Sequence, residues 1–116
     1  MADPRFVHLR VHSEFSITEG MVRIDELVVK AAADRMGAVA VTDLGNLFGM
    51  VKFYGAARSA GIKPILGVDV WITNDAERDK PWRALLLARN RHGYLLLCDL
   101  LTRAWLSNQH RGRAEV

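Results

Sequence analysis

The chain has 116 residues, which is enough for one small domain or for a piece of a larger one. Hydrophobic residues make up 50% and charged residues 25%, which excludes a disordered tail, and a net charge of +3 is too small to indicate nucleic-acid binding by itself. The single cysteine, Cys98, excludes an internal disulfide and predicts a reducing, cytoplasmic compartment. The sequence shows neither a secretory signal pattern nor an apolar run of membrane-spanning length.

The first half of the chain predicts strand, helix, strand and helix in that order. Alternating side chains predict the first strand, a helical stripe of apolar residues predicts each helix, and an unbroken apolar run predicts the second strand. Asn46 is expected to cap the second helix. The predicted ranges are a strand at 6–11, a helix at 23–36, a strand at 38–42 and a helix from 46 to a stop at Gly61.

The second half predicts two further strands and a helix. An apolar strand at 64–72 is followed by a polar, turn-like stretch at 73–81, a strand at 84–88 and a helix over about 91–106. The second and third strands lack polar alternation, which is typical of parallel strands covered by helices on both faces. The predicted class is therefore α/β, and an α/β barrel or an open doubly wound sheet both fit.

A few polar side chains lie where such a fold carries chemistry. His8, Arg10 and His12 share one face of the first strand, so the two histidines are either metal ligands or ordinary polar residues near a strand end. Asp43 follows the second strand and is either a ligand or orienting group, or a turn residue before a helix. Asp69 lies among apolar strand residues and needs a partner, such as a buried ion pair.

Several motifs, in order and in register, closely resemble the opening of the alpha subunits of bacterial DNA polymerase III, the replicative C-family polymerases. The matching segments are 6–16, 40–49, 51–54, 61–67, 86–90 and Gly93-Tyr94. The resemblance implies that residues 1–116 are the N-terminal, incomplete part of a polymerase-and-histidinol-phosphatase (PHP) domain. The implied fold is a distorted barrel of about seven β/α units with mostly parallel strands, truncated here after about four strands.

The resemblance also implies a set of site positions, and this chain departs from the metal-binding pattern at several of them. The implied positions are Arg10, His12, Glu19, Asp43, Leu44, Asp69 and Arg83. Arginine and leucine offer no lone pair to a metal, so Arg10, Leu44 and Arg83 predict a degenerate site with no bound zinc or manganese and no catalytic residue. Arg10 and Arg83 are expected to point inward and to pair with Asp69, Asp43 or Glu19, the alternative being two solvated surface arginines.

The implied function of this segment is a structural and interaction scaffold within a DNA-directed DNA polymerase. Expected partners are the rest of the polymerase chain, the proofreading exonuclease subunit and other holoenzyme subunits, with DNA bound through the parent chain and no membrane. The parent would use Mg²⁺ at a site outside this segment, which itself is expected to need no cofactor. The alternative is a free-standing, metal-dependent phosphoesterase of the PHP family. An incomplete barrel is also expected to self-associate, because it leaves strand edges unpaired.

Overall fold

The computed structural model describes residues 6–16 and 20–116, so the predicted site position Glu19 lies outside the described residues. In chain order the elements are a 3-10 turn η1 (Glu14–Ser16), α1 (Ile24–Ala33), β1 (Ala38–Val41), α2 (Met50–Ser59), β2 (Lys63–Ile72), β3 (Trp82–Leu87), α3 (Arg91–Ser107), β4 (Gln109–His110) and β5 (Arg113–Ala114). In the described residues, every helix is too short or too polar to span a bilayer.

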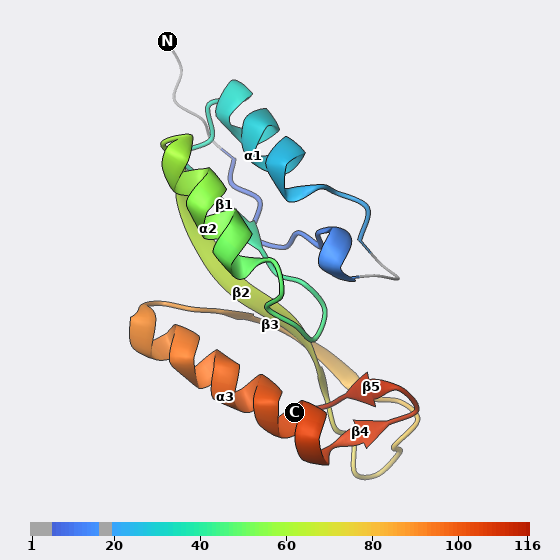
Figure 1. The fold of residues 1–116 in the computed structure, drawn as a ribbon. Helices are drawn as coiled ribbons and strands as arrows, with labels where there is room; N and C mark the ends of the chain where they lie inside the picture. The colour runs from blue at the N-terminus through green and yellow to red at the C-terminus, as the bar shows by residue number, and fades with distance from the viewer. Residues whose placement is uncertain (1–5, 17–19) are drawn as a thin grey trace.

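The long strand β2 is the centre of a mixed three-stranded sheet (Figure 1). Its first residues pair in parallel with β1, from Lys63 to Leu66, and its later residues pair antiparallel with β3, from Gly67 to Ile72. The expectation of mostly parallel strands is therefore corrected to a mixed sheet. The described strands form this open sheet and a separate hairpin of β4 and β5, so the expected barrel is not closed within this part of the chain.

The prediction of a strand at 6–11 is wrong, although the segment is extended and borders β1. Ala40 N–H donates to His8 O over 3.0 Å, and Thr42 N–H donates to Val11 O over 2.8 Å. The N–H of Val11 donates to the Thr42 hydroxyl over 3.0 Å, which is a side-chain bond and not a ladder bond. The two backbone acceptors, His8 and Val11, lie three residues apart while their donors lie two apart, so the segment does not pair with β1 in a regular ladder.

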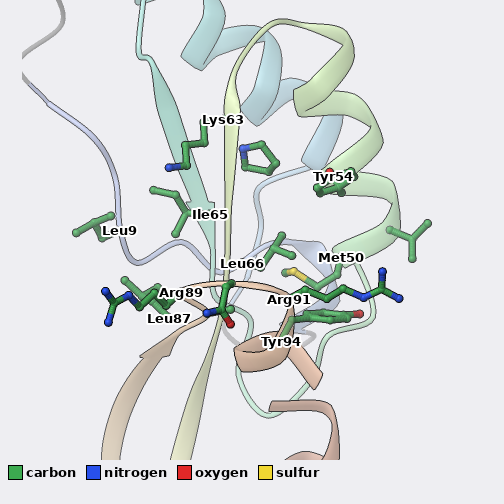
Figure 2. Close-up of a pocket in the computed structure, with 14 residues that line it drawn as sticks. Leu9, Met50, Tyr54, Lys63, Ile65, Leu66, Leu87, Arg89, Arg91 and Tyr94 are labelled. Atoms are coloured by element: carbon green, nitrogen blue, oxygen red, sulfur yellow. The ribbon is translucent and has the colours of Figure 1, made fainter. Parts of the chain in front are cut away.

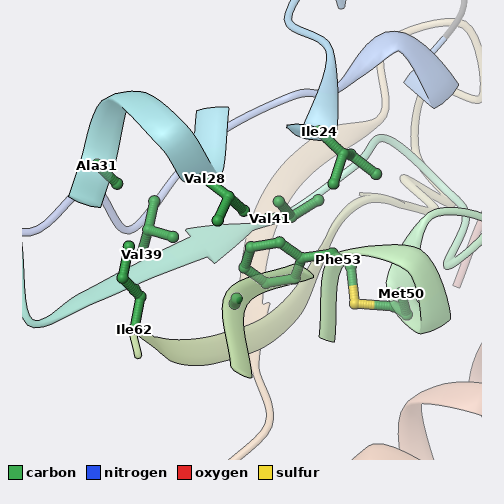
Figure 3. Close-up of a cluster of buried hydrophobic side chains, with 9 residues drawn as sticks. Ile24, Val28, Ala31, Val39, Val41, Met50, Phe53 and Ile62 are labelled. Carbon is green, nitrogen blue, oxygen red and sulfur yellow. The ribbon is translucent and has the colours of Figure 1, made fainter. Parts of the chain in front are cut away.

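Two apolar clusters hold the helices on one face of the sheet. Figure 3 shows the first, in which α1 and α2 meet over β1 around Phe53 and Val41, both fully buried. The second packs α3 against Val68 and Val70 of β2. Alternate residues of a strand face opposite sides, so the intervening Asp69 lies on the face away from these helices.

The observed ends of α2 and β3 differ from those predicted from the sequence. Asn46 does not cap α2: its side chain accepts from Phe48 N–H over 3.1 Å and donates to Phe15 O over 2.9 Å. The helix begins four residues later, at Met50, with Gly49 as its N-cap. At α3, by contrast, Asn90 is a side-chain cap that accepts from Gly93 N–H. The strand predicted at 84–88 begins two residues earlier and ends one residue earlier, as β3.

Candidate functional site

The site is centred on Asp69, in the second half of β2, whose side chain is fully buried. Arg10, from the extended N-terminal segment, binds both carboxylate oxygens: Nε donates to Oδ2 over 2.9 Å and Nη2 donates to Oδ1 over 2.8 Å. This two-pronged geometry is the strongest arrangement that a guanidinium and a carboxylate can form. It also ties together two segments that lie 59 residues apart in the sequence.

Two more side chains converge on the same carboxylate. Arg83 of β3 donates from Nη2 to Asp69 Oδ2 over 2.9 Å, and His12 Nε2 lies 2.9 Å from the same oxygen. The register of β2 with β3 explains why Arg83 can contact Asp69. Arg83 is paired with Trp71, so it is a diagonal neighbour of Asp69 on the same face of the sheet. Trp71 also supports the Arg83 guanidinium, which stacks 4.6 Å from the ring centroid. We call Arg10, His12, Asp69 and Arg83 the Asp69 cluster.

The electrostatics of the cluster keep Asp69 ionised. Burial by itself raises the pKa of Asp69, because it penalises the charged carboxylate. Hydrogen bonds from Arg10, Arg83 and His12, together with the positive charge of Arg83, outweigh that penalty and hold the pKa well below its ordinary value of 3.8. A carboxylate in this state is bound as a fixed anion and is a poor proton donor or acceptor near neutral pH.

Asp43 is the second buried carboxylate of the site, and it holds a different segment. Its oxygens accept from Ser13 N–H over 2.6 Å, from Ser13 Oγ over 2.7 Å and from Ser16 Oγ over 2.8 Å. The Ser16 hydroxyl also accepts from Leu44 N–H over 3.0 Å. Asp43 therefore anchors the turn that contains η1, and it neither joins the Asp69 cluster nor caps α2.

The structure thus brings four of the predicted site positions together, and the expected arginine–carboxylate contact is confirmed. Leu44 lies beside Asp69 through a parallel backbone bridge, without a polar side chain to contribute. His8, the other histidine of the first segment, contacts the ring of Phe6 edge-on at 4.7 Å and is not a hydrogen-bond partner of Asp69.

A neighbouring group of charged side chains was missed from the sequence. Glu115 is fully buried, accepts from the Thr73 hydroxyl over 3.2 Å and lies 3.6 Å from Arg78. Arg113 stacks on Trp71 at 5.2 Å, so this ring lies close to two guanidinium groups. The sequence offered one signal for this group of charged residues: Trp71 lies two residues after Asp69 in β2 and therefore on the same face of the strand. Nothing in the sequence placed Glu115 beside Trp71.

Comparison with models of protein families gives a match to the PHP domain over residues 8–116. The chain belongs to the PHP domain family. The DNA polymerase III alpha subunit of Neisseria meningitidis serogroup A is 54% identical over 106 residues, and that of Escherichia coli K12 is 49% identical over 105 residues. These matches cover 91% and 90% of this chain but only 9% of each relative, so this PHP chain spans about a tenth of their length.

A solved structure with the same fold is an amidohydrolase from Chromobacterium violaceum, determined with bound sulfate and no metal. It superposes with a TM-score of 0.64 at 22% sequence identity, over 84% of this chain and 32% of that chain. The likeness supports the α/β fold of this PHP domain and says nothing about its chemistry.

The residues present in this PHP domain do not fit a multinuclear metal centre. Three of the positions implied by the family pattern carry Arg10, Leu44 and Arg83, which have no lone pair for a metal. Asp69 could ligate a metal, but guanidinium groups already occupy both of its oxygens. Across residues 6–16 and 20–116, no three His, Cys, Asp or Glu side chains are grouped so as to hold a metal ion.

Proposed function

We propose that this PHP domain is the first part of a DNA polymerase III alpha subunit and serves DNA-templated DNA synthesis in chromosome replication as a scaffold. The observation that carries the proposal is the identity of 54% and 49% to alpha subunits of two bacteria over about nine-tenths of the chain. The synthesis itself would take place in the remainder of the polymerase, at a Mg²⁺ site outside this segment.

The Asp69 cluster supports a structural role for the segment. It joins the N-terminal segment, β2 and β3 through one buried carboxylate, with Arg10 lying 59 residues before Asp69 and Arg83 lying 14 residues after it. Arginine remains charged at all physiological pH values and gives a planar fork of donors, so it neutralises the buried carboxylate without a metal. In this view the domain has exchanged a metal centre for an ion-pair centre.

The metal-dependent phosphoesterase alternative is less well supported. Such an enzyme needs neutral imidazoles and carboxylates around its metals, and Arg10, Leu44 and Arg83 replace them here. As a scaffold, the domain would pack against the rest of the polymerase chain and contribute surface to the proofreading exonuclease and other subunits of the holoenzyme in the cytoplasm.

The proposal is tested by adding an affinity tag at Met1 to the chromosomal copy of the gene and purifying the tagged polypeptide. We expect a polypeptide roughly ten times as long as this chain, since the match covers 9% of each relative, and we expect it to extend a primed DNA template. A tagged polypeptide of about 13 kDa, or one that hydrolyses phosphate esters and does not extend primers, contradicts the proposal.

A further inference from the structure

An open groove of about 760 Å³ lies where the start of α2, the first residues of β2 and the start of α3 meet. Figure 2 shows its labelled side chains on both sides of β2, with Ile65 and Leu87 on one side and Met50 and Tyr94 on the other. No residue of the Asp69 cluster lines this groove. It is therefore a feature separate from the site described above.

The floor of the groove is apolar and accessible. Val51, on the first turn of α2, is 84% exposed, and Leu9 and Leu87 are each more than one-third exposed. Aliphatic side chains dominate the floor, namely Leu9, Met50, Val51, Ile65, Leu66 and Leu87. A concave apolar surface of this kind is typical of sites that receive apolar side chains of a partner.

The charged side chains at the rim of the groove are all positive. These residues are Lys63, Arg89 and Arg91, all exposed, and no aspartate or glutamate among residues 6–16 and 20–116 lines the groove. Arg58 lies just outside, over the ring of Tyr54 at 5.8 Å. An apolar floor within a cationic rim is complementary to a ligand that is apolar in its centre and acidic at its edges.

The backbone at the groove favours a helical ligand over an added strand. Lys63 N–H donates to Gly37 O on the β1 side of β2, so the backbone of the next residue, Pro64, faces the groove side. Proline has no N–H, which removes the donor that a new strand would need at that place. A helix needs no edge donors and inserts side chains instead.

We propose that this groove binds an amphipathic helical segment of a protein partner, with its apolar side chains on the floor and its acidic residues against Lys63, Arg89 and Arg91. A nucleic-acid strand fits the cations but not the floor, because bases bind chiefly by stacking on aromatic rings. Only Tyr54 and Tyr94 among the lining residues are aromatic. The proposal does not depend on the polymerase assignment.

The test uses the full-length tagged polypeptide and a phage-displayed library of random peptides of roughly 16 residues, long enough for about four helical turns. We expect selected peptides to be acidic, with apolar residues at helical spacing. Their affinity should fall by about tenfold or more for the K63E/R89E/R91E variant, as expected for lost charge complementarity. The matched control, K80E/R103E/R111E, reverses three exposed cations outside the groove and should leave the affinity unchanged.

Three outcomes overturn the proposal. The first is selection of neutral or basic peptides, or of peptides that bind both triple variants equally well. The second is displacement of the peptides by a single-stranded oligonucleotide. The third is slow maleimide labelling of a V51C variant of the full-length polypeptide compared with a K80C control, because that result means the chain's own remainder covers the groove. Rapid labelling at both positions is expected.

Discussion

Asp69 is a fully buried carboxylate that accepts hydrogen bonds from two guanidinium groups and contacts an imidazole. Desolvation makes such a group costly, and the gain from pairing exceeds the cost only where geometry is favourable and every oxygen is satisfied. Both oxygens are satisfied here, at 2.8 to 2.9 Å. Removing one of these donors should therefore lower the free energy of unfolding more than removing one partner of a surface ion pair of the same residue types does.

For Arg10→Ala we expect a loss of about 1–3 kcal/mol in the free energy of unfolding, measured by urea denaturation. The loss lies between the limits for exposed and buried pairs, because the Arg10 side chain is half exposed while Asp69 is buried. Arg10→Lys should retain only part of this free energy of unfolding, since an ammonium group cannot form the two-pronged contact. Lys30→Ala, which removes the exposed Lys30–Asp34 pair, is the control and should cost under about 0.5 kcal/mol. Equal effects of Arg10→Ala and Lys30→Ala contradict the expectation.

The depressed pKa of Asp69 predicts how its contribution depends on pH. The folded-state pKa lies below the ordinary value of 3.8, so the stabilisation is fully present above about pH 5 and is lost as the pH falls through 3.8 towards the folded-state pKa. The difference in unfolding free energy between the wild-type chain and Asp69→Asn should therefore not shrink as the pH is lowered from about 7 to about 5, and should shrink below about 4. A difference that disappears by about pH 5 shows that Asp69 is not held as an anion.

At the scale of elements, β2 changes its partner at Gly67. Leu66 is its last residue paired with β1, and Gly67 is its first paired with β3. The two strands approach closely there: a Cβ on Gly67 would lie 2.5 Å from the Leu86 carbonyl oxygen and 3.1 Å from a Thr42 methyl. The backbone carbonyl cannot move aside without loosening β3, so this position needs glycine.

Gly67→Ala should therefore destabilise the chain by about 1–3 kcal/mol, the usual range for overpacking. Gly55→Ala is the matched control, because Gly55 lies in α2 with no atom within 4 Å of an added Cβ. That substitution should stabilise by up to about 1 kcal/mol, since alanine favours helix more than glycine does. Thermal unfolding of both variants measures the two effects, and a neutral Gly67→Ala contradicts the close approach.

The helices could be predicted because their apolar stripes are long enough to be distinctive, and the buried strands β1 and β2 because their sequences are largely apolar and end at turn residues. The antiparallel direction of β3 was missed, although the connection at 73–81 is too short for a parallel crossover. The hairpin of β4 and β5 could not be predicted, since two-residue strands have no period to detect. Asn46 misled the prediction because its side chain bonds to nearby backbone groups equally well in a turn.

The Asp69 cluster could likewise be predicted only in part from the sequence. Asp69 could be singled out as a carboxylate among apolar strand residues that needs a partner, and the family resemblance placed Arg10 and Arg83 at positions of the same site. The role of Asp43 stayed open because its partners, Ser13 and Ser16, lie about thirty residues earlier and have no periodic relation to it.

At the scale of the whole molecule, apolar side chains remain exposed along α3. Leu95 and Leu96 are each more than half exposed, and Leu106 is 81% exposed. Isolated residues 1–116 are therefore still expected to self-associate, since exposed apolar surface of this kind favours contact between copies. Light scattering should give a mass above that of one 13.0 kDa chain, and a stable monomer at high concentration contradicts the expectation.

Guanidinium groups are proposed to take the place of metal ions around Asp69, and the metal content of the purified protein tests this proposal. The tagged full-length polypeptide is saturated with zinc or manganese, dialysed and analysed for bound metal, beside the R10H/L44H/R83H variant that restores imidazoles at three positions. Because the rest of the polypeptide is the same in both, the difference in metal content between them reports on this domain. We predict that the variant retains more metal than the wild-type polypeptide. A wild-type polypeptide that retains metal which Asp69→Asn removes contradicts the claim.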